Sequence, residues 1–180
     1  MVIELRHLTY DDLGLFADID RAEQVDVMYR LVDDELSPTS VDIEVPPWDP
    51  AGSGEHSVAH IVDFCAPLVS DGAIFVGAFD RQRVAGLDIV VPDFEPGLAW
   101  LAILHVSRWA RRRGVGSTLW NSAVETARAA GAQRLYVSAA PTRSAVDFYL
   151  SHGCRLAGSA TNSELHRQEP DDIHLICHIA

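Results

Sequence analysis

The stretch L-H-V-S-R-W-A-R-R-R-G-V-G-S, residues 104–117, joins the end of an apolar run to the start of a helix. Apolar residues then follow at helical spacing, at Leu119, Trp120, Ala123, Val124 and Ala127. Gly131 is a usual C-terminal stop. We therefore predict a strand ending at Val106, a turn with three arginines, and a helix that opens at two glycines.

The predicted turn is suited to an anion. The first amides of a helix have no intrahelical partner, and the helix dipole places positive charge at the same end. Gly114 and Gly116 allow close approach to the backbone. Such a turn can cradle phosphate, and the guanidinium groups of residues 111–113 would add matching donors. A basic turn before an ordinary helix is the alternative.

Two other phosphate motifs do not fit this stretch. A Walker A loop requires a lysine, and the chain contains none. The dinucleotide fingerprint requires G-x-G-x-x-G directly after a first strand. Here the pattern is R-x-x-G-x-G, deep in the second half of the chain.

The stretch resembles a family motif. Arg111-x-x-Gly114-x-Gly116, after a strand, is similar to the acyl-CoA pyrophosphate loop of the GNAT superfamily of N-acyltransferases. Residues 142–154, T-R-S-A-V-D-F-Y-L-S-H-G-C, resemble the family's N-x-x-A-x-x-[LF]-Y-x-x-x-G-F helix. Thr142 replaces the usual Asn, and Cys154 replaces the usual Phe. The resemblance covers residues 99–156, including a strand at 134–138.

The resemblance implies an α/β (α+β) fold of the GNAT type. Its central sheet would be mixed, mostly antiparallel and twisted, with about six to seven strands flanked by about four helices. We expect one domain over residues 1–180. Residues 1–98 would form the acceptor side with an irregular loop at 37–57, residues 99–156 the acyl-CoA core, and residues 157–180 the closing strands.

The resemblance also implies the co-substrate, acetyl-CoA, without a metal. The pantetheine arm would bind along the backbone of Leu104, His105 and Val106, near Thr142 and Tyr149. The pyrophosphate would bind the turn, at Arg111, Arg112, Arg113, Gly114, Val115, Gly116 and Ser117.

Catalysis needs an acid for the leaving thiolate and a base for the amine. Tyr149 occupies the family's general-acid position, and its hydroxyl can donate to sulfur. Many relatives carry a Glu on the central strand, where this chain has Ala102. The base therefore stays open among Glu23, Asp20, His105 and water-mediated proton loss.

The acceptor side is expected before residue 98. Asp20 and Glu23 follow the first helix at the edge of the usual acceptor cleft, and Tyr29 lies nearby in sequence. Trp48 stands among carboxylates, an arrangement that can form one wall of an amine pocket. A surface loop anchored by this one Trp is the alternative.

Composition indicates an ordinary globular chain. It has 180 residues, 48% hydrophobic and 22% charged, which suits one core. No signal-peptide pattern and no apolar run of about 20 residues occurs. Cys65, Cys154 and Cys177 form no C-x-x-C motif, so we predict reduced thiols in a cytoplasmic protein.

The net charge of −12 is unevenly distributed. Residues 1–80 contain 17 Asp and Glu against 3 Arg, whereas the remainder contains 9 against 11. The acidic half argues against a nucleic-acid partner and would attract a cationic amine. A solvated surface that aids solubility is an equal alternative.

Hydrophobic periodicity predicts the other elements. Asp33-Asp34 would turn a strand at 25–31 into a hairpin, although a continued helix is the alternative. The remaining predictions are strands at 2–7, 73–79, 84–91 and 100–106, helices after Thr9 and Ser57, and closing strands at 156–161 and 173–179 around a polar loop.

Together these observations predict an N-acetyltransferase that moves an acetyl group to a primary amine of a small molecule by direct attack in a ternary complex. A protein N-terminus is the second choice of acceptor. The rival hypothesis is a non-catalytic module that binds acyl-CoA, because the strand Glu is missing. We expect no membrane partner and a possible homodimer.

Overall fold

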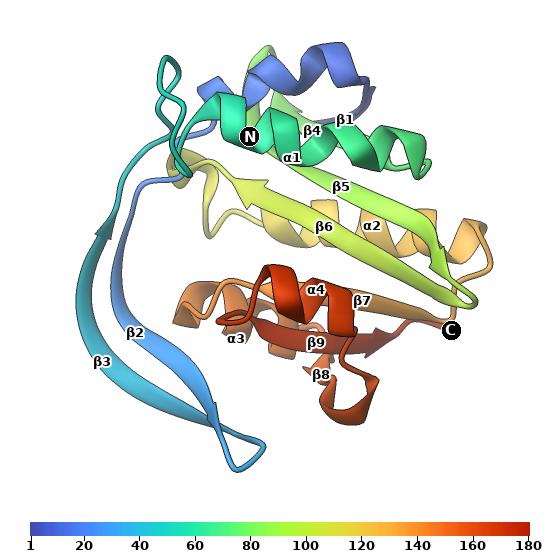
Figure 1. The fold of residues 1–180 in the computed structure, drawn as a ribbon. Helices are drawn as coiled ribbons and strands as arrows, with labels where there is room; N and C mark the ends of the chain where they lie inside the picture. Colours follow the sequence, from blue (N-terminus) through green and yellow to red (C-terminus); the bar gives the residue numbers. More distant parts are fainter.

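The computed structural model describes residues 1–180 and contains a seven-stranded mixed sheet. Its order is β1-β4-β5-β6-β7-β9-β8, and every neighbouring pair is antiparallel except β6 and β7. This is the α+β sheet predicted from the sequence (Figure 1). The strands are β1 (Ile3–Leu8), β4 (Ile74–Asp80), β5 (Arg83–Glu95), β6 (Leu98–Val106), β7 (Arg134–Ala139), β8 (Arg155–Leu156) and β9 (Ile173–His178).

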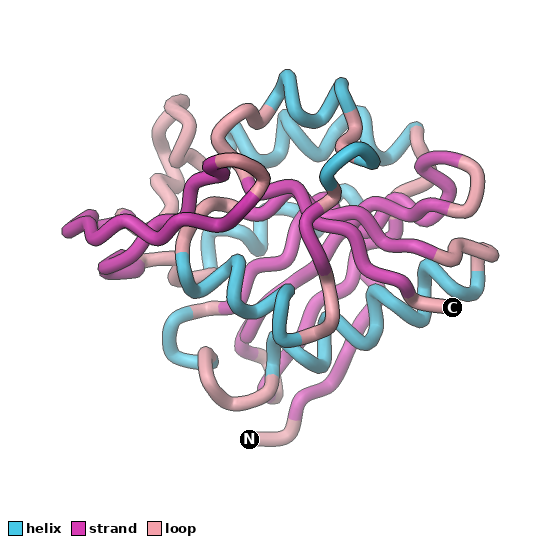
Figure 2. The backbone as a smooth tube through the Cα atoms, turned by 90° about the horizontal axis from the view of Figure 1, so that it is seen from below, coloured by secondary structure: helices cyan, strands magenta, loops and turns pink.

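Helices cover both faces of the sheet (Figure 2). Helices α2 (Val115–Ala129) and α3 (Arg143–Ser151) pack on one face. The 3-10 helix η1 (Tyr10–Asp18), α1 (Val58–Ser70) and α4 (Ser163–Gln168) pack on the other. Two 3-10 turns, η2 (Arg108–Ala110) and η3 (Gly158–Ala160), complete the elements. The sheet therefore lies between two layers of buried apolar side chains.

Strands β6 and β7 pair only at one end. Their parallel ladder runs from Leu98↔Arg134 to Leu101↔Val137 and then stops. At this point β6 has a bulge, since Ile103 pairs with Ile89 and Leu101 with Val90. Bulges bend a strand and increase its twist. The two strands consequently diverge, as Figure 1 shows, and the second half of β6 has a free edge toward β7.

Strands β2 (Glu23–Val32) and β3 (Glu35–Val45) form a separate hairpin that projects from the sheet (Figure 1). Asp33 and Asp34 both have positive φ, 51° and 62°, as the predicted tight turn requires. The hairpin docks on α3, because the Tyr29 hydroxyl donates to Asp147 at 2.9 Å and Arg143 pairs with Asp26.

The prediction of an irregular loop at 37–57 is wrong for its first part. Residues 37–45 belong to β3, where Ser40 and Ile43 pair with β2. Pro38 suggested a loop, yet it pairs with Tyr29 in a two-stranded sheet whose strands both have a free edge. Proline is tolerated at such an edge because its missing N–H costs no ladder bond. Only residues 46–57 are irregular.

The closing region also differs from the prediction. The expected strand 156–161 ends at Leu156, and η3 follows. The expected polar loop contains α4, because Asn162 caps this helix by accepting from the amides of Glu164 and Leu165. Leu165 is buried and attaches the helix to the core. The antiparallel pairing of β8 with β9 agrees with the prediction.

The prediction of three reduced thiols is wrong for two of them. Cys154 and Cys177 form a disulfide, and Cys65 is free and buried. The register places Arg155 opposite Ile176, so the two cysteines are neighbours across an antiparallel pair. Because the two cysteines are 23 residues apart in sequence, their pairing could not be predicted from spacing. None of the helices has the length and apolar character needed to cross a membrane.

Candidate active site

The turn before α2 presents free backbone donors. The amides from Arg112 to Ser117 donate no hydrogen bond within the protein, and the first bond of the helix runs from the Thr118 amide to the Gly114 carbonyl at 3.0 Å. Arg112 and Gly114 have φ of 61° and 85°. Left-handed residues turn successive amides toward a common point, which creates an anion-binding concavity. The turn therefore has the free amides and left-handed residues that an anion site requires.

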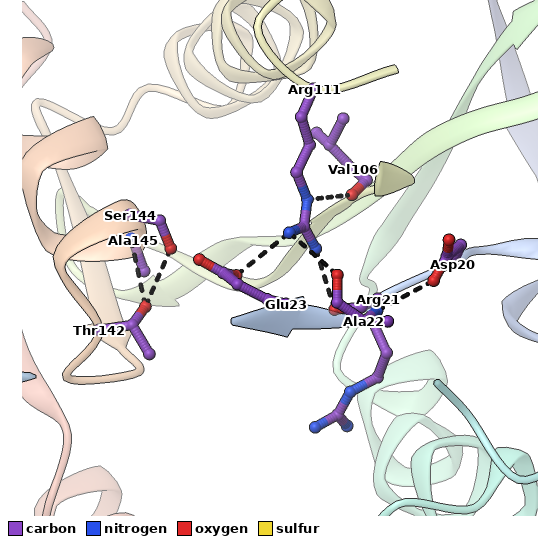
Figure 3. A network of polar contacts seen from close by, with 9 residues as sticks. All are labelled: Asp20, Arg21, Ala22, Glu23, Val106, Arg111, Thr142, Ser144 and Ala145. Atoms are coloured by element: carbon purple, nitrogen blue, oxygen red, sulfur yellow. Dashed lines mark hydrogen bonds and ion pairs between the residues drawn. The ribbon is translucent and has the colours of Figure 1, made fainter. Parts of the chain in front are cut away.

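The three arginines of the turn divide into two kinds. Arg112 and Arg113 are exposed beside the free amides. The Arg111 side chain points away from them and donates to the carbonyls of Val106, Ala22 and Arg21 (Figure 3). The expectation that this guanidinium binds pyrophosphate is therefore wrong. Its structural task is to tie β2 to the end of β6.

Glu23 is the fourth partner of Arg111. Its carboxylate lies 3.2 Å from the guanidinium, so its charge is balanced (Figure 3). A carboxylate held in an ion pair is a weak candidate for the base. Asp20 is similarly engaged, because it accepts from the Ala22 amide at 3.1 Å. Both residues lie where the N-terminal segment meets the end of β6, and neither carboxylate is free.

The hydroxyl of Thr142 is used as a helix cap. It accepts from the Ala145 amide and contacts Ser144 (Figure 3). Thr142 also bridges Met28 of β2. Thr142 lies at the start of α3, as the sequence predicts. Its hydroxyl is occupied by capping the helix.

The strand expected to bind pantetheine is β6, and contacts within the protein already occupy part of its C-terminal end. Leu104 and His105 pair with β5 on one side and have no strand partner on the other. The Val106 carbonyl already accepts from Arg111 at 3.1 Å, so it is not free for an added strand. The available edge is thus the segment before Val106.

His105 lies in an aromatic enclosure. Its ring centroid is 5.5 Å from Trp48 and 6.2 Å from Phe16. Burial, followed by the charges of Arg21 and Arg111, lowers the pKa of His105 to about 4. The imidazole is neutral at neutral pH and a weak base. Trp48 is itself buried and stacks under Arg21, so it is part of the core and not an open pocket wall.

Tyr29 was expected at the acceptor site. Its hydroxyl donates to Asp147, and its amide donates to the Pro141 carbonyl at 2.7 Å. These bonds fasten β2 to the start of α3. The polar groups of Tyr29 are therefore already paired within the protein.

Tyr149 projects from α3 into the layer between the helices and the sheet. It is 7% exposed and packs edge-on against Trp120, with ring centroids 5.8 Å apart. Its hydroxyl has no hydrogen-bond partner in the chain. Burial is the main cause that raises the pKa of Tyr149 well above its usual value, and the charges of Asp88 and Asp172 add to it. The phenol is protonated and free to donate.

Two carboxylates that act on Tyr149 were not predicted from the sequence. Asp88 of β5 is 1% exposed, and neither carboxyl oxygen has a partner. Asp172, just before β9, accepts from the Ser138 hydroxyl at 3.0 Å, and burial raises its pKa. A hint of Asp88 exists in V-A-G-L-D-I-V-V, residues 84–91, where one acid interrupts an apolar strand.

The arrangement joins an anion cradle, a free strand edge and a protonated phenol. Such a set suits a phosphate-bearing thioester laid along β6, with its leaving sulfur at the phenol. The structure contains no group of three or more His, Cys, Asp and Glu side chains placed to hold a metal ion.

Comparison with known families agrees with this geometry. The family model described as "Acetyltransferase (GNAT) family" matches residues 34–154, more than half of the chain. The chain belongs to the GNAT acetyltransferase family. It is accordingly an N-acetyltransferase that depends on acyl-CoA. No curated protein sequence matches this GNAT chain significantly.

Solved structures show the same fold. A nourseothricin acetyltransferase matches with a TM-score of 0.71 and 17% identity, covering 100% of both chains. A protein described as a streptothricin acetyltransferase from Bacillus anthracis, in complex with acetyl-CoA, has a TM-score of 0.61 and 16% identity over 99% of this chain and 98% of that one. PaiA N-acetyltransferase from Thermoplasma acidophilum, bound to CoA, has a TM-score of 0.62 and 15% identity over 99% of each chain.

A glycine substitution tests the anion cradle. Gly114→Ala forces a side chain into left-handed geometry, which costs about 1–2 kcal/mol. The free turn can relax, but binding must restore it, so the Kd for CoA should rise about tenfold in calorimetry. Gly131→Ala is the matched control, since Gly131 has φ of 86° and equally open surroundings at the other end of α2. Equal CoA affinity in both variants would refute the cradle.

The burial of Asp88 should make stability depend on pH. Burial raises the pKa of Asp88 from 3.8 to about 8, so between these values the folded chain retains a proton that the unfolded chain has lost. Stability must then fall as pH rises, by about 1.4 kcal/mol per pH unit relative to Asp88→Asn. Urea unfolding of both proteins across this range measures the slope. Parallel curves would show that the folded carboxyl titrates normally.

Proposed function

We propose that this enzyme transfers the acetyl group of acetyl-CoA to a primary amine of a small molecule, by direct attack in a ternary complex. The observation that carries the proposal is the divergence of β6 from β7 after Leu101 and Val137. This opening has the free amides near one end and Tyr149 on the neighbouring helix. Acetyl-CoA supplies an activated acyl group when it is bound there.

The residues of the chain fit the shape and charge of acyl-CoA. A diphosphate can accept from the amides between Arg112 and Ser117, and two exposed arginines add charge. The free edge of β6 can hydrogen-bond an extended amide-containing arm in the manner of an added strand. These contacts would bring the thioester to the bulge at Ala102.

A cavity of about 600 Å³ suits the amine. It lies between the tip of the β2–β3 hairpin and the segment before β9, and Asp34, Asp171 and Asp172 contribute carboxylates to its lining. Carboxylates attract an ammonium group and hold it by charge-assisted hydrogen bonds. The volume is in the range of small-molecule sites. Two proteins of the same fold are described as a nourseothricin acetyltransferase and a streptothricin acetyltransferase, which is consistent with a small acceptor.

Asp172 is the base that these contacts favour. A free alkylammonium has a pKa of about 10.4 and must lose a proton before attack. Burial raises the pKa of Asp172, which makes the carboxylate a better proton acceptor. It lines the cavity proposed for the amine, and its charge acts on Tyr149. Glu23, by contrast, is neutralised by Arg111.

The protons balance across the reaction. The amine nitrogen forms a bond to the acetyl carbon while the carbon–sulfur bond breaks. The ammonium nitrogen gives one proton to Asp172, which releases it to solvent, and loses a second proton after it attacks the acetyl carbon. Tyr149 gives its hydroxyl proton to the departing thiolate, and the second nitrogen proton restores the phenol through solvent. Once Asp172 is protonated, one of the two negative charges that raise the pKa of Tyr149 has gone.

The direct test is thiol release from acetyl-CoA with a panel of small amines. We expect release that depends on the amine, with one acetyl group transferred per thiol by mass spectrometry. Tyr149→Phe should lower kcat about 100-fold, within the usual range for loss of a general acid, and leave the Kd for CoA unchanged. Asp172→Asn should lower kcat most at low pH, where the amine begins protonated.

Gln24→Ala is a suitable control, because Gln24 contacts only Asp42 on the exposed hairpin. Binding of CoA without thiol release on any amine would instead identify a non-catalytic acyl-CoA module. Loss of CoA binding in Tyr149→Phe at an unchanged rate would exclude this residue as the acid.

A further inference from the structure

Asp88 is the most anomalous side chain of the protein. It is buried to 1% exposure, and both of its carboxyl oxygens lack a partner. Buried polar groups in proteins are nearly always hydrogen-bonded, because an unpaired one is costly. An unpaired carboxyl in the middle of β5 destabilises the fold, so we look for a function that explains it. The proposed binding of acyl-CoA and of the amine does not involve Asp88.

Asp88 faces the layer that contains Tyr149. It lies between Val76 of β4 and Leu104 of β6 in the strand register. Leu104 packs against the apolar cluster that includes Tyr149, and Val90, two residues beyond Asp88 on the same face, belongs to that cluster. The carboxyl and the phenol thus share one apolar layer, where charges interact over longer distances than in water.

Few other charged or titratable groups face this layer, and His152 of α3 is one of them, with its ring centroid 5.3 Å from that of Trp120. The residues of α2 buried against the sheet are apolar, namely Val115, Leu119, Trp120, Ala123, Val124 and Ala127. Glu125 and Arg128 of α2 are not among the buried residues, and β4 contributes Val76. His105 of β6 faces the opposite layer, against Trp48. Asp172 is the other charge that acts on Tyr149.

We propose that Asp88 controls the acid of the reaction through Tyr149: its neutral carboxyl lets the phenol give up a proton, and its ionised carboxylate holds that proton back. The inference rests on the proposed function of Tyr149. Donation to the thiolate leaves a phenolate, and a second negative charge in the same apolar layer opposes that phenolate. Asp88 is therefore a positioning residue that acts by charge and touches no substrate.

The ionisation of Asp88 falls within the working range of an enzyme. Burial raises the pKa of its carboxyl to about 8, and no charged neighbour contributes to this shift. Below this value the carboxyl is neutral and Tyr149 is the stronger acid. Above it, turnover should fall as the ionised fraction grows.

The pH profile of kcat tests the proposal. With saturating acetyl-CoA and amine, wild-type kcat should fall about tenfold per pH unit above the pKa of Asp88. Asp88→Asn cannot ionise and should show no such fall, with an unchanged calorimetric Kd for CoA. NMR of protein with 13C-labelled aspartate gives a reading without turnover: one carboxyl should titrate at the inflection of kcat and be absent in the variant.

A double-mutant cycle with Tyr149→Phe shows whether Asp88 acts through the phenol. The alkaline fall should be absent in Tyr149→Phe with either Asp or Asn at position 88, because coupled residues are not additive. Val76→Ala, beside Asp88 in the register, is the packing control and should keep the fall.

Three outcomes would overturn the role of Asp88. They are an Asp88→Asn profile that still falls, a fall that persists in Tyr149→Phe, and an Asp88 carboxyl that titrates far from the inflection. Absence of thiol release by the wild-type chain with every amine would instead refute the proposed function, and with it any role of Asp88 in turnover.

Discussion

The site depends on one constraint: β6 and β7 must pair firmly at one end and separate at the other. The parallel ladder ends at Leu101 and Val137, and the bulge at Ala102 turns β6 away. Antiparallel neighbours hold the outer sides of both strands, so the sheet tolerates this gap. Backbone groups that would otherwise pair with each other become available to an extended ligand.

Charged or ionisable side chains act on both sides of this opening: Arg111 and Glu23 on one side and Tyr149 on the other. Arg111 fastens β2 to the end of β6 through three carbonyls and Glu23, so the N-terminal segment is held beside the gap. In the apolar layer on the other side, burial keeps Tyr149 protonated. How easily Tyr149 releases that proton depends on the charges of the nearby carboxyls, Asp88 and Asp172. These charges change with pH, and in the proposed reaction the charge of Asp172 also changes when it takes a proton from the amine.

Local features were predictable from the sequence. The turn with Gly114 needs a left-handed residue and free amides, which depend on neighbouring residues alone. The helix carrying Tyr149 was predicted from its resemblance to the motif of the GNAT family. Features that depend on distant contacts were not. The direction of the Arg111 side chain is set by Ala22 and Glu23, some 90 positions away. The disulfide likewise depends on the register of β8 against β9.

The candidate base shows the same limit. Sequence reasoning left the base open among Glu23, Asp20, His105 and water. Asp172, which we propose instead, reaches Ser138 and a surface cavity through the fold of the C-terminal segment. Asp88 was visible as one acid within an apolar strand, but its proximity to Tyr149 requires two strands and two helices to be packed together.

A crystal structure of the protein with CoA bound tests the central claim most directly. The account predicts a diphosphate within hydrogen-bond distance of the amides between Arg112 and Ser117, an arm along the free edge of β6, and a sulfur atom beside the Tyr149 hydroxyl. A diphosphate bound elsewhere, or a sulfur atom separated from Tyr149 by packed side chains, would contradict it.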